Sequence, residues 1–288
     1  MWDVLVSPFT EFQFMRAALV SVVFLALSAA PVGVFLVIRR MSLMGDALSH
    51  AVLPGAAAGY MLAGLSVPAM SLGGFVAGVV MAVLAGLVSR FTTLKEDASF
   101  AAFYLSSLAL GVLMVSRGGN NVDLLNLLFG SILGIDTPSL ALIACVTSVT
   151  VVALAIMYRP LVLESIDPLF LRAVGGKGSW WHLLFMLLVV LNLVAGFQAL
   201  GTLMSVGLMM LPAISARLWS QRLGLILACS AFIALLCGYG GLLLSFYIEI
   251  PSGPAIILLC GLVYLLSVFL GKEGGLVAQW VRGRHKKA

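Results

Sequence analysis

Two residues with metal-binding side chains, Asp46 and His50, lie four positions apart in the segment Met41 to Gly55. On a helix this spacing places both side chains on one face, where they can contact the same object. A carboxylate and an imidazole suit Zn²⁺ or Mn²⁺, and two such ligands supply about half of a coordination sphere. The pair is a candidate metal site; the alternative is a hydrogen-bonded pair that locks this helix to a neighbour.

A few other polar residues also need an explanation in so apolar a chain. Glu249 could line the entrance of a cation path together with Asp123, or it could be a solvated loop acid. Asn192 and Gln198 could face such a path, or could bond across helices. Three methionines are expected to be packing residues rather than soft ligands: Met204, Met209 and Met210.

The composition requires a membrane environment. Of 288 residues, 62% are hydrophobic and 9% are charged, and the mean hydropathy is +1.17. Soluble domains are about one quarter charged, so the chain is predicted to be a polytopic membrane protein. The apolar runs are long and do not alternate, which favours an all-α transmembrane bundle over a β-barrel. The four cysteines have no CxxC spacing and are expected to fill the core.

We predict eight or nine spans in a single domain covering residues 1–288, after a short interfacial lead-in at 1–13. Within the second span, Pro54 should kink or break the helix. Residues 117–137 are predicted to form a loop and a short interfacial helix. The nine expected spans are 14–38, 43–64, 67–89, 98–116, 138–158, 180–199, 203–219, 223–246 and 254–271.

The distribution of basic residues predicts the orientation. With the N-terminus outside and the C-terminus cytoplasmic, only Arg16 and Arg117 of the 16 Lys and Arg residues fall outside. Cytoplasmic loops carry an excess of Lys and Arg, so this orientation is favoured. The same distribution argues against nucleic-acid binding, because the charges mark loops rather than form a patch. Residues 272–288 are predicted to form a basic cytoplasmic tail.

The longest charged connection, from Arg159 to Gly178, contains signals for a short helix at residues 164–175. Asp167 before Pro168 is a helix-start signal, and Gly175 is a stop signal. We interpret this segment as a docking element for a cytoplasmic partner; a helix that rests on the lipid surface is the alternative. The residues assigned to it are Glu164, Asp167, Leu169, Phe170, Arg172 and Gly175.

Several blocks of the sequence resemble the ABC-3 family of permeases, the membrane subunits of zinc, manganese and iron ABC importers. The first block is the segment Met41 to Gly55 that carries Asp46 and His50. The others follow in family order across nearly the whole chain, at Lys95 to Ala98, Leu128 to Leu133, Gly201 to Ala213 and Pro251 to Pro254. One block departs from the pattern, since Met209, Met210 and Leu211 stand before Pro212 where the family more often has Ala-Leu-Leu.

The resemblance implies a homodimer with a central translocation path, driven by a separate cytoplasmic ATPase and supplied by an external solute-binding protein. It places Asp46 and His50 at the pathway metal positions and residues 164–175 at the coupling helix that contacts the ATPase. Glu249 matches an acidic position before the family's Pro-Ser-Gly. The implied location is the bacterial cytoplasmic (inner) membrane, where the chain would be multi-pass and surrounded by lipid.

The functional hypothesis is therefore a transporter subunit, not an enzyme, that moves divalent metal inward with no fixed cofactor. The sequence has no Gly-x-x-x-x-Gly-Lys-Ser/Thr motif, so ATP would be hydrolysed by another chain. The affinity order of divalent metals favours Zn²⁺ over Mn²⁺ or iron as the cargo. Two other classes are an ATPase-independent secondary transporter and an intramembrane metalloenzyme, which would need a motif such as His-Glu-x-x-His.

Overall fold

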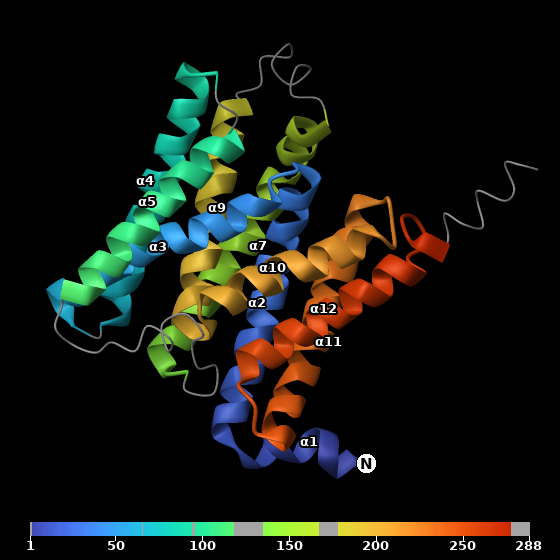
Figure 1. The fold of residues 1–288 in the computed structure, drawn as a ribbon. Coiled ribbons are helices and arrows are strands. Elements are labelled where there is room, and N and C mark those ends of the chain that lie inside the picture. Colours follow the sequence, from blue (N-terminus) through green and yellow to red (C-terminus); the bar gives the residue numbers. More distant parts are fainter. Residues whose placement is uncertain (1, 65, 94–95, 118–134, 167–177, 278–288) are drawn as a thin grey trace, which may run out of the picture.

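The computed structural model describes residues 2–64, 66–93, 96–117, 135–166 and 178–277, and within these ranges every regular element is a helix. Figure 1 shows them as one bundle. The helices are α1 (Trp2–Glu11), α2 (Gln13–Ile38), α3 (Ser42–Ala63), α4 (Val67–Phe91), α5 (Glu96–Arg117), α7 (Thr137–Ile166), α9 (Gly178–Leu200), α10 (Thr202–Arg217), α11 (Leu223–Ile248) and α12 (Ser252–Leu270). The all-α prediction is confirmed.

Six helices contain segments long and apolar enough to cross a membrane, namely α2, α4, α7, α9, α11 and α12. Two shorter apolar segments lie in α5 and α10. The remaining predicted span corresponds to α3, whose Asp46 and His50 lower its hydropathy. Its 22 residues would still extend about 33 Å, enough to span the apolar part of a bilayer. Each predicted span therefore has a helix in its place, and α3 runs unbroken through Pro54.

The largest boundary error concerns α7. The sequence predicted a span ending at residue 158 and a charged connection beginning at Arg159, but the helix continues to Ile166. Proline removes one backbone hydrogen bond from a helix interior, yet α7 also continues through Pro160. The last turns of α7 are held by tertiary contacts: Leu161 is fully buried, and Glu164 is paired with Arg39, which directly follows α2.

The bundle has a central group of helices with a further group on each side. α3 packs against α4 and α5 on one side, while α10, α11 and α12 pack together on the other. Between them, α2 contacts α7, α10 and α11, and α9 contacts α7, α4 and α10 (Figure 1). α3 therefore reaches the rest of the bundle through α9, α10 and α2.

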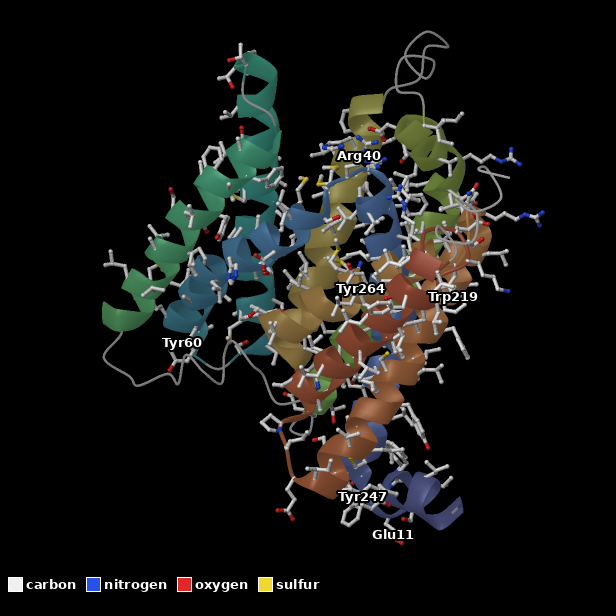
Figure 2. All side chains as sticks on the ribbon, turned by 45° about the vertical axis from the view of Figure 1, so that its right-hand side comes forward. Glu11, Arg40, Tyr60, Trp219, Tyr247 and Tyr264 are labelled. Carbon is white, nitrogen blue, oxygen red and sulfur yellow. The ribbon has the colours of Figure 1, made fainter. Side chains whose placement is uncertain are left out.

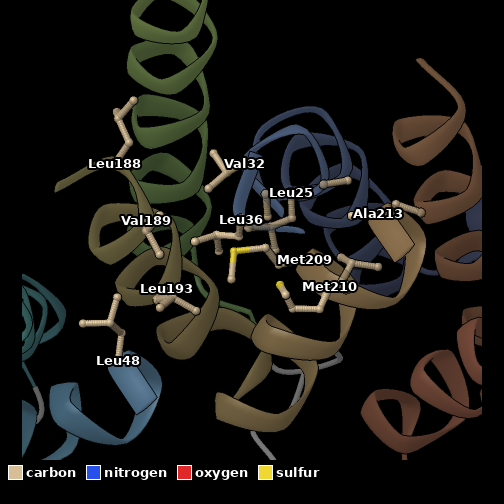
Figure 3. Packing of buried hydrophobic residues seen from close by; sticks show 14 of the residues in the cluster. Leu25, Val32, Leu36, Leu48, Leu188, Val189, Leu193, Met209, Met210 and Ala213 are labelled. Carbon is tan, nitrogen blue, oxygen red and sulfur yellow. The ribbon is translucent and has the colours of Figure 1, made fainter. Parts of the chain in front are cut away.

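Small residues allow the helices to approach closely, as the sequence predicts for packing in lipid. A side chain at Gly33 of α2 would overlap the backbone carbonyl of Met209 in α10. Met204, Met209 and Met210 are buried, and the last two pack among aliphatic side chains such as Leu36 and Ala213 (Figure 3). Their predicted role as packing residues is confirmed.

Labelled residues show which parts of the chain lie at each end of the bundle. Arg40 lies toward one end, and Glu11 and Tyr247 lie toward the other (Figure 2). The predicted lead-in is helix α1, which is anchored at the second end, where Phe9 stacks on Tyr239 at 5.2 Å between ring centroids. Arg40, which is predicted to be cytoplasmic, thus lies at a different end from Glu11 and Tyr247, which are predicted to be external.

Candidate metal site

A tight corner sets the position of Asp46. α2 ends at Ile38, and α3 begins at Ser42. In the corner, Arg40 adopts a left-handed backbone conformation with φ of 60°, and the Met41 amide donates to the Leu36 carbonyl at 2.9 Å. Left-handed backbone is uncommon for a residue other than glycine, so these contacts must hold it. Asp46 therefore lies in the second turn of α3, close to the end of α2.

The two candidate ligands face each other on α3, as their spacing predicts. His50 Nε2 lies 3.7 Å from Asp46 Oδ1. This distance is too long for a good hydrogen bond, but it is shorter than twice a metal–ligand bond of about 2.1 Å. One cation between the two atoms could therefore bind both. The exposed fraction of the side chain is 59% for Asp46 and 23% for His50, so the carboxylate is open to an arriving ion.

The imidazole of His50 is held by packing on its other side. The Tyr104 ring, from α5, stacks on it with 5.8 Å between centroids and 29° between the planes. His50 Nδ1 is buried and has no hydrogen-bond partner within the described residues. Among the described residues no hydrogen bond occupies either ring nitrogen, and Nε2, which faces Asp46, is available to coordinate a ligand. Tyr104 was not predicted, because nothing in the sequence relates a tyrosine of α5 to a histidine of α3.

The pair is an incomplete coordination sphere. Among the residues that the structure describes, no group of three or more His, Cys, Asp and Glu side chains could hold a metal ion. A structural metal centre usually has four protein ligands, whereas a transport site must release its ion. Two ligands would leave most of a cation's coordination shell to groups outside the pair.

Glu249 lies far from this pair. It ends α11 in a left-handed conformation with φ of 57°, and its side chain is exposed. The α11–α12 corner is at the end of the bundle where α1 lies, whereas the α2–α3 corner is at the other end (Figure 1). The structure therefore does not bring Glu249 and Asp46 into one site, although both could lie along one path.

Asn192 is buried between α7 and α9. Its side-chain amide donates to Thr150 Oγ1 and to the Leu188 carbonyl, both at 2.8 Å. The interhelical bond is one of the two interpretations that the sequence left open. Its buried Oδ1 has no partner within the described part of the chain, so a role in a path stays a prediction.

Several predicted residues cannot be placed. Asp123, the side chain of Gln198, and the segment 167–177 with Asp167, Leu169, Phe170, Arg172 and Gly175 lie outside the described residues. Glu164, assigned to the same segment, belongs to the last turn of α7 and faces the bundle. Its Oε2 lies 2.7 Å from Arg39 Nη2, and its side chain is only 14% exposed.

Comparison with known proteins identifies the family. The profile of the ABC 3 transport family matches residues 11–271. The chain belongs to this family. As a member of the ABC 3 family it is a multi-pass membrane permease, and the resemblance inferred from the sequence blocks is confirmed.

Relatives within the ABC 3 family match along nearly their whole lengths. The chain is 29% identical to the manganese transport system membrane protein MntC of Halalkalibacterium halodurans, over 96% of this chain and 94% of the relative. It is 31% identical to the manganese import system permease ScaB of Streptococcus parasanguinis, over 91% and 92%. Among solved structures, PsaBC from Streptococcus pneumoniae in complex with Fab contains a chain with TM-score 0.86 and 27% identity, matched over 99% of this chain and 100% of that one.

Proposed function

We propose that this chain is the permease of an ABC importer that carries manganese into the cytoplasm. The observation that carries the proposal is the Asp46–His50 pair, whose two ligand atoms lie 3.7 Å apart in the block that resembles the family's metal positions. Relatives that match nearly the whole chain are named as manganese transport proteins. The site gives the cation a place to bind, and its incomplete ligand set allows release.

Manganese replaces zinc as the proposed cargo. The affinity order that favoured zinc describes how tightly a site of given ligands binds, but selectivity in cells comes from geometry, ligand type and metal availability. A carboxylate with water suits manganese as well as zinc, so Asp46 and His50 alone do not select between them. The names of the relatives favour manganese, and they give no support to zinc.

The proposed assembly is a homodimer of nine-span subunits in the bacterial inner membrane, with the N-terminus outside. Two copies of the Asp46–His50 pair would then face a central path and could complete one shell. The Arg40 end of the bundle would be cytoplasmic, so that residues 167–177 meet an ATPase, and the Glu249 end would meet a solute-binding protein. The excess of basic residues on the Arg40 side supports this orientation.

Dependence on a separate ATPase tests the proposal. In cells that express the chain with its ATPase and binding protein, we expect manganese uptake to fall to background when the ATPase carries a substitution of its P-loop lysine. The reason is that this sequence holds no P-loop of its own. The measurement is manganese content per cell after a short exposure, with the chain quantified in membranes. Uptake that persists without ATP hydrolysis would instead indicate a secondary transporter.

A further inference from the structure

A buried cluster of polar side chains, which we call the Arg39 cluster, joins the ends of three helices. Arg39 follows α2, Glu164 and Ser165 lie in the last turn of α7, and His182 lies in the first turns of α9. The Arg39 guanidinium lies 2.7 Å from Glu164 Oε2 and donates to Ser165 Oγ at 3.2 Å. Its Nη1 is 3.4 Å from His182 Nδ1, and its Cζ lies 4.6 Å from the centre of the Phe185 ring.

The chemistry of arginine makes this cluster a rigid connection. The guanidinium is planar and always charged, and its nitrogens point in fixed directions. Here three different nitrogens address three different residues, and an aromatic face covers the carbon between them. The exposed fraction is 7% for the Arg39 side chain and 14% for Glu164. Charges this deeply buried need their partners, so the relative positions of the three helix ends are tightly constrained.

The location of the cluster distinguishes it from an ordinary buried ion pair. Residues 167–177 join α7 to α9. The cluster therefore contacts the end of α7 and the start of α9, on either side of that connection. On its other side, Arg39 begins the α2–α3 corner, and Asp46 follows seven positions later. The corner itself is fixed by the left-handed Arg40 and by the Met41–Leu36 hydrogen bond. One guanidinium thus lies between the cytoplasmic connection and the helix that carries the metal pair.

We propose that Arg39 is a positioning residue that transmits movement of the 167–177 connection to α3. The inference rests on the proposed function, in which that connection contacts the ATPase. When the connection moves, the helix ends at Glu164 and His182 move with it. Because the guanidinium contacts both side chains, the α2–α3 corner moves as well. Asp46 and His50 would then change their position relative to the path at the moment of ATP hydrolysis. Arg39 does not touch the metal; it acts through the helix end that it holds.

The number of manganese ions transported per ATP hydrolysed tests this proposal, measured in vesicles that contain the permease, its ATPase and the loaded binding protein. For Arg39→Gln, and for Glu164→Gln, we expect ATP hydrolysis to continue and the ratio to fall by about 5- to 30-fold, at the upper end of the usual effects on coupling. A purely structural role would reduce the amount of folded complex but would leave this ratio unchanged. Arg159→Gln is the matched control, since Arg159 is an exposed arginine on α7, and it should keep the wild-type ratio.

A second variant keeps the test decisive if Arg39→Gln does not fold. Arg39→Lys retains the charge but replaces the three contacting guanidinium nitrogens with a single ammonium group. We therefore expect this variant to assemble and still to show a lowered ratio of manganese transported to ATP hydrolysed. A wild-type ratio in Arg39→Lys, or in a folded Arg39→Gln, would overturn the proposal. Failure of the proposed function has a different signature: in that case the unaltered complex would not transport manganese at all.

Discussion

Replacing either Asp46 or His50 with alanine is expected to lower manganese uptake by at least about 10-fold, while the amount of chain in the membrane stays unchanged. Losing even an outer-shell partner of a metal ligand commonly costs about 10- to 100-fold in affinity or activity, and a direct ligand should cost no less. The two candidate ligand atoms lie close enough to contact one cation, with 3.7 Å between Nε2 and Oδ1. Uptake of radioactive manganese by cells, normalised to the chain in the membrane, measures the effect.

The control for this prediction lies on the same helix. Leu43 is 76% exposed in the first turn of α3 and carries no ligand atom, so Leu43→Ala should transport normally. Asp46→Asn refines the result, because it keeps the size of the side chain and one oxygen ligand but removes the charge. We expect the manganese uptake of Asp46→Asn to lie between that of the wild type and that of Asp46→Ala. Normal manganese uptake by both alanine variants would show that Asp46 and His50 are not ligands on the transport path.

Gly55→Ala is expected to destabilise the protein by about 1–3 kcal/mol, the usual cost of overpacking a close contact. An added Cβ at Gly55 would overlap the carbonyl oxygen of Gly73 in α4, and a Cβ at Gly73 would overlap the carbonyl oxygen of Gly55. Both obstacles are backbone atoms, so neither can be relieved by a change of rotamer. The helices would have to move apart, and α3 would carry His50 with it. The midpoint of thermal unfolding in detergent measures the loss of stability.

Gly86→Ala on α4 is the matched comparison, because a Cβ at that position meets no atom of the other described elements within 4 Å. Alanine has the higher helix propensity, by about 1 kcal/mol, so this variant should be as stable as the wild type or slightly more stable. Equal unfolding midpoints for Gly55→Ala and the wild type would show that the α3–α4 contact is not close in the folded protein.

Much of the fold could be predicted from the sequence, because lipid imposes a simple rule on each span. An apolar run such as Leu223 to Ile248 has to form a helix, since its backbone has no water to bond. The rule fails where tertiary contacts outweigh a local signal. At Arg159 the sequence indicated the end of a span, but α7 continues through Pro160 because Leu161 is buried and Glu164 pairs with Arg39.

The contacts of the candidate site likewise fall into those that the sequence could predict and those that it could not. Asp46 and His50 could be paired from the sequence because helical periodicity relates residues four positions apart. Tyr104 on His50, and Arg39 on Glu164, could not be paired, because each contact joins residues more than 50 positions apart. The cargo could not be predicted from the ligands either. A carboxylate and an imidazole fit zinc and manganese alike, and the proposal of manganese rests on the names of the relatives.

The most direct test of a manganese permease that works through Asp46 is accumulation of radioactive manganese by proteoliposomes that hold the chain with its ATPase. The vesicles receive binding protein loaded with either manganese or zinc on the outer side and ATP on the other. We predict ATP-dependent accumulation of manganese by the wild type, with vesicles carrying Asp46→Ala remaining at the level without ATP. Accumulation of zinc but not manganese, or equal accumulation by the wild type and Asp46→Ala, would contradict it.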